Sequence, residues 1–178
     1  MKKEIIRNNA SHEAGHWLTG WILGQSSQSI LISCESNGPD SYCERKPHPN
    51  FLNLSEINEN LGHRVINLLS GAKAECLVMG EFKHEIYKDL VSDYKGAWPD
   101  YFMASELFRY YYRSIPEISR KSFEEEWREL ERKCEEIILS NIQFINSVTS
   151  AAIEKAKLSP LTVTFSFEEM IDIFHNSK

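Results

Sequence analysis

Two histidines and a glutamate near the start of the chain form the pattern with the clearest chemical meaning. They lie in the run His12-Glu13-Ala14-Gly15-His16. In a helix, residues four apart share a face with Cβ atoms about 5–6 Å apart, so both imidazoles could bind one metal ion. Glu13 would lie beside the first ligand, within reach of a zinc-bound water. The pattern therefore predicts a zinc site with His12 and His16 as ligands and Glu13 as general base.

Such a site would support the hydrolysis of a peptide bond. Zinc lowers the pKa of a bound water to about 7, so a carboxylate can accept its proton at neutral pH. Glu13 would activate this water and then pass the proton to the leaving amine. The sequence offers no nucleophile with an adjacent base, and we therefore do not expect a covalent mechanism.

The same five residues could also lie on an ordinary surface helix, but the flanking residues weigh against that alternative. Gly15 would lie in mid-helix, where glycine costs roughly 1 kcal/mol relative to alanine, and a close backbone contact would explain its presence. Trp17, Leu18 and Trp21 indicate that the helix is buried. Histidines on a buried helix need polar partners, and a metal ion supplies one.

A third protein ligand is required, because catalytic zinc sites use three such ligands and keep one position open. In one class of zinc peptidase, a glycine lies three residues and a third histidine ligand six residues after the second histidine. This chain has Thr19 and Ile22 at those positions. That arrangement is excluded. A downstream glutamate, Glu75, or an aspartate further along the chain are the remaining candidates.

Hydrophobic periodicity predicts the elements that must position these residues. The predicted helices cover residues 3–23, 55–79, 99–113, 123–152 and 167–174. A shorter turn of helix is expected around residues 90–97, and a short strand over 29–34. Residues 35–53 are rich in Pro, Asn, Asp and Ser and predict a long loop or a small irregular hairpin. The sequence thus predicts a mainly α fold with a minor β element.

Several of these boundaries depend on capping residues. Gly24 is expected to end the first helix in a left-handed conformation, and Gly80 to end the second. Ser55 is expected to cap the start of the second helix. Pro99 should lie in the first turn of its helix, where proline is tolerated. The run Ser166-Phe167-Glu168-Glu169 has the form of a capping box.

Length and charge narrow the class of protein. The 178 residues, with a formal net charge of −6, suit one domain over residues 1–178. The acidic balance argues against nucleic acid as a partner, because phosphate binding needs a basic face. The longest uncharged stretch is apolar only from Trp17 to Leu23, so we expect no membrane insertion. No secretory signal is recognisable, and we expect a cytoplasmic protein.

The four cysteines give no disulfide or zinc framework. Cys34, Cys43, Cys76 and Cys134 include no Cys-x-x-Cys pair, and we expect reduced thiols. Cys34, Cys43 and His48 lie close together in one polar segment. Their spacing matches no zinc pattern, so a second metal site there is the less favoured alternative.

Several segments together resemble the peptidase domain of the FtsH-type ATP-dependent zinc metalloproteases. Residues 12–16 are identical to the family's zinc-binding helix. Residues 70–75 and 79–81 are similar to the helix that follows it, and residues 134–158 are similar to its closing helices. The resemblance implies a zincin-like helical peptidase domain, zinc as cofactor and a protein or peptide substrate.

The resemblance also implies an aspartate as third zinc ligand, within a family motif of the form Asn-Asp-Leu-x-x-Ala-Thr. Asp93 and Asp100 both lie four residues before an alanine. The distance of Asp93 from His16 suits the family better, whereas the residues after Asp100 match the motif better. We therefore expect Asp93 as the ligand, with Asp100 as the first alternative and Glu75 as a further one; if Glu75 is not a ligand, its alternative role is to orient a ligand histidine.

The chain departs from that family in its organisation. No Gly-x-x-x-x-Gly-Lys-Ser/Thr run occurs in the 178 residues, and the family's membrane helices are also missing. We therefore expect an ATP-independent endopeptidase that acts on flexible or unfolded segments, or one that relies on a partner ATPase or on homo-oligomer formation. The alternative is a catalytically retired peptidase-like fold that serves as a metal-holding binding or regulatory module.

Overall fold

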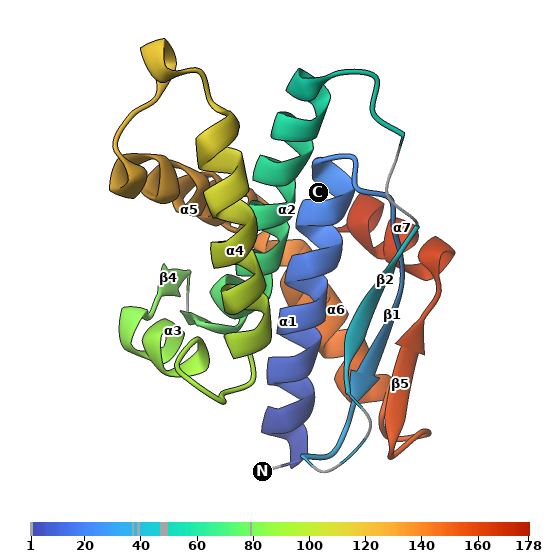
Figure 1. Ribbon diagram of the computed structural model, residues 1–178. Coiled ribbons are helices and arrows are strands. Elements are labelled where there is room, and N and C mark those ends of the chain that lie inside the picture. Colours follow the sequence, from blue (N-terminus) through green and yellow to red (C-terminus); the bar gives the residue numbers. More distant parts are fainter. Residues whose placement is uncertain (1, 37, 39, 47–49, 79) are drawn as a thin grey trace.

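The computed structural model describes residues 2–36, 38, 40–46, 50–78 and 80–178 and is mainly helical with a small sheet (Figure 1). The helices are α1 (Lys2–Ile22), α2 (Leu54–Glu75), α3 (His84–Leu90), α4 (Trp98–Ser114), α5 (Phe123–Ser140), α6 (Ile142–Lys155) and α7 (Phe167–Asn176), with a 3₁₀ turn at Glu117–Ser119. The strands are β1 (Ser27–Ser33), β2 (Tyr42–Arg45), β3 (Leu77–Val78), β4 (Glu81–Phe82) and β5 (Thr162–Phe165). None of the described helices combines the length and the hydrophobicity needed to cross a membrane.

Helix α1 runs through the middle of the molecule, with the sheet on one side and α2 and α4 on the other (Figure 1). Its second half is buried on every side, from Glu13 to Gly20. At its end Gly24 has a φ of 71°, which confirms the predicted left-handed C-cap. A helix buried in this way holds its polar side chains in fixed surroundings, and the two histidines are among them.

The three-stranded sheet has the antiparallel order β2-β1-β5. β1 confirms the predicted strand, and Ile30 and Ile32 point into the core. Of the two structures considered for residues 35–53, the hairpin is correct, because Tyr42 pairs with Leu31. β5 was not predicted. Since β1 occupies the centre, β2 is left as an edge strand beside α1.

Helix α2 begins earlier and ends earlier than predicted. Its N-cap is Asn53, whose side chain accepts a hydrogen bond from the Glu56 backbone N–H at 3.0 Å, so the prediction of Ser55 is wrong. The helix ends at Glu75, because β3 and β4 form a tight hairpin in which Gly80 has a φ of 82°. Met79, the predicted last residue, lies outside the described residues.

The predicted helical turn over 90–97 is also wrong. A helix of seven residues, α3, ends at Leu90, and the chain then reaches α4 through a series of turns in which Tyr94 has a φ of 65°. α4 itself confirms the predicted helix, with Pro99 in its first turn. These turns decide where the acidic residues between 91 and 100 lie.

The long helix predicted over 123–152 is in fact two helices, α5 and α6. They meet at Asn141, which has φ −129° and ψ 27° and whose side-chain amide donates to the Ile137 carbonyl at 2.8 Å. An asparagine that binds a nearby backbone carbonyl favours such a break. The change of direction lets α5 pack on α2 while α6 packs on α1. The Ser166 capping box at the start of α7 is confirmed.

The core is aromatic around the middle of α1. Trp17 is fully buried against Phe144 and Phe174, with ring centroids 5.2 and 6.2 Å away. Its indole N–H donates to the Gln28 carbonyl at 2.8 Å, so its only polar atom is satisfied. This packing fixes the rotation of α1 about its axis, and with it the direction in which the histidines point.

A buried ion-pair group, which we call the lysine cluster, joins α2 to α5. Lys73 Nζ lies 2.6 Å from Glu135 and 3.4 Å from Glu131, and 4.1 Å from the centre of the Tyr87 ring. Burial opposes the charge of Lys73, but the hydrogen bond to Glu135 and the negative charges of Glu131 and Glu135 together outweigh burial and raise the lysine pKa.

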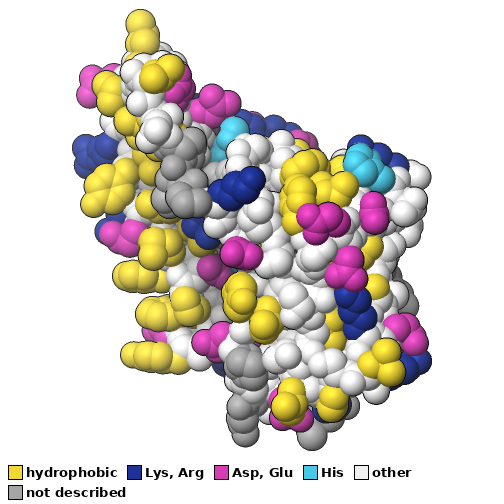
Figure 2. Space-filling view, turned by 90° about the vertical axis from the view of Figure 1, so that its right-hand side faces the viewer, with side chains coloured by type: hydrophobic (Ala, Val, Ile, Leu, Met, Phe, Trp, Pro, Cys, Tyr) yellow, Lys and Arg dark blue, Asp and Glu magenta, His cyan; other side chains and the backbone are white. Residues whose placement is uncertain are grey.

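The outer face of α4 carries exposed apolar side chains. The rings of Tyr94, Trp98 and Phe102 form a stacked row, with centroids 5.7 and 5.4 Å apart. Figure 2 shows hydrophobic side chains projecting along its left-hand edge, the side on which α4 lies. This row faces away from α1, because Trp98 and Phe102 lie about 200° around the helix from Asp100.

Candidate metal centre

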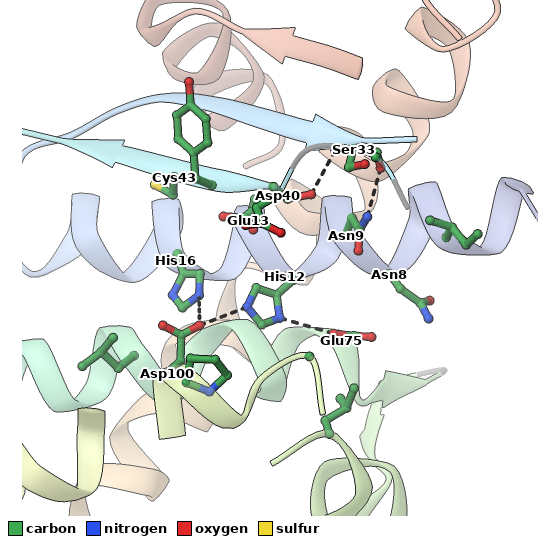
Figure 3. Close-up of a pocket in the computed structure, with 18 of the residues that line it drawn as sticks. Asn8, Asn9, His12, Glu13, His16, Ser33, Asp40, Cys43, Glu75 and Asp100 are labelled. Carbon is green, nitrogen blue, oxygen red and sulfur yellow. Dashed lines mark hydrogen bonds and ion pairs between the residues drawn. The ribbon is translucent and has the colours of Figure 1, made fainter. Parts of the chain in front are cut away.

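Helix α1 presents both histidines toward α2 and α4, as the four-residue spacing predicts. The His12 and His16 rings lie with centroids 4.8 Å apart and planes at 72° (Figure 3). Both side chains are largely buried, at 14% and 11% exposure. Two imidazole nitrogens are thus held at one place beneath the helix.

Asp100, in the first turn of α4, brings a carboxylate to these nitrogens. Its Oδ2 lies 3.3 Å from His12 Nε2 and 3.2 Å from His16 Nε2 (Figure 3). Asp93 lies in the exposed turn before α4, outside this group. The preference for Asp93 is therefore corrected in favour of Asp100, because the turns over 91–97 direct the later aspartate toward α1. We call His12, His16 and Asp100 the metal group.

The spacing within the metal group fits a single ion. Ligands placed tetrahedrally at about 2.0–2.1 Å from zinc lie about 3.3–3.4 Å from one another. The two measured nitrogen–oxygen distances are 3.3 and 3.2 Å, and all three ligand atoms lie within 4.8 Å of one another. Among the described residues this is the one cluster of His, Cys, Asp and Glu with such convergence.

The far nitrogen of each imidazole has its own partner. His16 Nδ1 lies 2.7 Å from the Asn67 carbonyl oxygen, which can only accept, so Nδ1 carries the proton. His12 Nδ1 lies 3.3 Å from Glu75 Oε2. Both contacts direct the Nε2 lone pairs toward Asp100, as outer partners do in metal sites. Glu75 thus lies where the orienting role predicted for it requires, behind His12.

The space for the metal group depends on a glycine of α2. A Cβ added to Gly71 would lie 2.5 Å from His12 Nε2 and 2.6 Å from His16 Nε2. On α1, a Cβ on Gly15 would lie 2.5 Å from the Ser70 carbonyl oxygen. The close contact expected at Gly15 is therefore confirmed, and it brings the two helices together at the level of the site.

Glu13 projects from α1 toward β2, whereas His12 and His16 project toward α2 and α4 (Figure 3). It is only 5% exposed, and no described residue hydrogen-bonds its carboxylate. Burial raises its pKa, although the neighbouring His16 and His12 act in the other direction. Since no described residue occupies the Glu13 carboxylate, its oxygens can accept a proton from a small molecule in the cleft.

Without a metal, the group is held together by its own charges. Burial disfavours a proton on His12, but Asp100 and Glu75 outweigh it and raise the pKa of His12 to about 10. The Asp100 carboxyl is buried too, yet its hydrogen bonds to His12 and His16 hold its pKa well below the usual range. Metal binding would displace the proton on the imidazole.

The metal group and Glu13 open into one cleft of about 740 Å³ between α1, β2 and the start of α4. Its described lining includes five carboxylates, those of Glu13, Glu35, Asp40, Glu75 and Asp100, and a single Lys or Arg side chain, Arg45. Besides the metal group, the cleft is lined by Tyr42, Cys43 and Arg45 of the edge strand β2.

The cysteines lie apart from this chemistry. Cys43 lines the cleft, but burial raises its pKa to about 12, so it is a thiol rather than a thiolate at neutral pH. All four cysteines are free, and Cys34, which directly follows β1, is buried. His48, part of the less favoured second site, lies outside the described residues.

Of the predicted residues, the structure brings together His12, His16 and the alternative ligand Asp100, with Glu75 behind them and Glu13 in the same cleft. Sequence reasoning missed Asn67, whose backbone carbonyl holds His16, because a backbone contact leaves no sequence signal. No family model and no curated protein matches the chain. The resemblance to the FtsH-type peptidase domain therefore stays a prediction based on the residues that carry it.

Proposed function

We propose that the protein is a zinc-dependent metallopeptidase with a zincin-like fold, in which His12, His16 and Asp100 hold the metal. One observation carries this proposal: the three ligand atoms converge at separations of 3.2–3.3 Å around Asp100 Oδ2. Two imidazoles and one carboxylate form a donor set that suits zinc, and three protein ligands leave a position open for substrate or water.

When bound, zinc supplies Lewis-acid chemistry, because it polarises a carbonyl and makes water acidic near neutral pH. The side chains of the chain supply the proton transfers. Glu13 accepts the proton of the attacking water and delivers it to the leaving amine. Its place supports this role, since the Glu13 side chain is buried, lines the same cleft as the metal group and has no hydrogen-bond partner among the described residues.

The substrate class follows from the shape of the cleft. A cleft that runs beside an edge strand admits an extended chain, whereas a folded domain presents few such segments. We therefore propose that the substrate is a flexible or unfolded protein segment. The described residues supply their chemistry without a nucleotide, so hydrolysis should proceed without ATP.

The test begins with metal content. Protein purified without chelator and offered zinc should hold about one zinc per chain. Asp100→Ala should lose most of it, and Asp93→Ala, the matched control in the exposed turn, should retain it. A wild-type protein that stays empty would contradict the proposal.

A second variant tests the chemistry. Glu13→Gln should retain zinc and lose hydrolysis of an unfolded reporter protein by about 10²–10⁴-fold, the usual contribution of a general base. Zinc bound in the wild type without any hydrolysis would instead favour the metal-holding binding or regulatory module.

A further inference from the structure

Two arginines converge on one neutral oxygen at the end of the cleft nearest His16. Arg45 Nη1 of β2 lies 3.2 Å from Asn67 Oδ1, and Arg64 Nη1 of α2 lies 2.9 Å from the same atom. A guanidinium has five N–H donors, and each of these two arginines uses one of them in its hydrogen bond to Asn67. Neither forms an ion pair with a described carboxylate.

The oxygen on which they meet is held in place. Asn67 is 1% exposed, and its Nδ2 donates to the His16 carbonyl at 2.6 Å and to Thr19 Oγ1 at 2.9 Å. These two bonds fix the orientation of the amide, so Oδ1 must face the arginines. The Asn67 backbone carbonyl also accepts the His16 Nδ1 proton. The pair of cations and the metal group are therefore joined through one buried residue.

Two like charges near one another repel, and an anion between them removes that cost. The planar guanidinium fork matches the two oxygens of a carboxylate, which it binds through paired hydrogen bonds. Arg45 is half-buried and is the one Lys or Arg among the described residues of the cleft lining. The five carboxylates of the lining lie elsewhere in the cleft, so a substrate anion is favoured next to Arg45 and disfavoured near those carboxylates.

We propose that Arg45, held on Asn67 and backed by Arg64 just outside the cleft lining, forms a carboxylate-binding subsite at the His16 end of the cleft. This inference rests on the proposed peptidase function and assigns its substrate class: peptides that place an acidic side chain or a C-terminal carboxylate next to the bond that is cleaved. The same arrangement sets the direction of the bound chain, because Glu35, another lining residue, lies toward the start of α1, where it pairs with Lys2.

The test measures binding, so that it does not depend on catalysis. Three probes are titrated by calorimetry into full-length Glu13→Gln protein, zinc-loaded and zinc-free: acetyl-Ala-Ala with a free carboxylate, its C-terminal amide, and acetyl-Glu-Ala amide. A charge-assisted pair of hydrogen bonds should favour a carboxylate over the amide by about tenfold or more. The two acidic probes distinguish a terminal carboxylate from a side-chain carboxylate.

Arg45→Gln, placed in the same background, should abolish that preference, and Arg64→Gln should reduce it. Lys46→Gln removes the same charge from the neighbouring exposed residue and should leave it intact. Equal binding of acid and amide, or an undiminished preference in Arg45→Gln, would overturn the subsite. If the wild-type protein shows no hydrolysis while this carboxylate preference is present, the subsite stands and only the peptidase function is contradicted.

Discussion

Helix α2 separates two buried charged groups, and the carboxylates of each group are balanced by positive charge from a different source. In the lysine cluster, Lys73 carries a permanent charge and neutralises Glu131 and Glu135 from within the chain. In the metal group, Asp100 and the nearby Glu75 face imidazoles, which are cations only when protonated. The first group is complete without a ligand. The second lacks a fixed cation, and it opens to a cleft through which one can enter.

The comparison predicts that residues on one side of α2 control metal binding and residues on the other control stability. Gly71 and Lys73 are two positions apart and therefore point to nearly opposite sides of the helix. Changes at these positions, and at the partners of each group, should separate the two properties.

The largest effect is expected for Gly71→Ala. The added Cβ would lie 2.5 Å from His12 Nε2, so the rings must move and their convergence on Asp100 is lost. Zinc affinity should fall by more than the roughly 100-fold that loss of an outer partner can cost. Competition with a fluorescent chelator measures this. Gly96→Ala, with no atom within 4 Å of the added Cβ, is the control and should bind zinc normally.

Glu75→Gln should have the next largest effect. It removes the charge behind His12 while retaining a side chain of the same shape, so zinc affinity should fall by about 10–100-fold with one zinc still bound. The same chelator competition reports it, with Glu85→Gln on α3 as the exposed control. An unchanged affinity would show that the 3.3 Å contact to His12 does not support the ligand.

Lys73→Met tests the other side of α2. It leaves Glu131 and Glu135 without their cation, but these side chains are 24% and 34% exposed, so water relieves part of the cost. The free energy of unfolding should fall by about 1–2 kcal/mol, less than for a fully buried pair. Urea denaturation measures it, with the exposed Lys88→Met as control. A marked loss of zinc in Lys73→Met would break the proposed separation.

Glu135→Gln should have the smallest effect. Lys73 keeps its contact with Glu131 at 3.4 Å, and the lost partner is partly solvated. We expect a decrease below about 1 kcal/mol that shrinks further at high salt. Urea denaturation at two salt concentrations measures it. A loss as large as that of Lys73→Met would assign the whole contribution of the cluster to this one pair.

Sequence reasoning placed residues correctly where their relative positions are determined within a single helix. The spacing of His12 and His16 determines their separation in any helix, so two of the three residues of the metal group could be placed. The third depended on residues 91–97, whose turns follow no period. Asp93 and Asp100 have the same relation to a following alanine, and only the folded path of these turns distinguishes them.

As with the metal group, part of the fold could be predicted from the sequence and part could not. The mainly helical composition and the short strand follow from periodicity, but the break at Asn141 does not, because hydrophobic residues keep the same spacing on both sides of it. The contact of Arg45 and Arg64 with Asn67 could not be predicted from the sequence either. Their meeting point on Asn67 depends on the pairing of β2 with β1, and no local pattern encodes that register.

The position of Asp100 on α4 has a mechanical consequence. It lies 88 residues from His12 and 84 from His16, so an ion held by all three would act as a cross-link that closes a loop of that length. Such closures restrict the unfolded chain, and the restriction grows with loop length. Chelation should therefore loosen the attachment of α4, and the connecting turns should become the first segment that an added protease cuts.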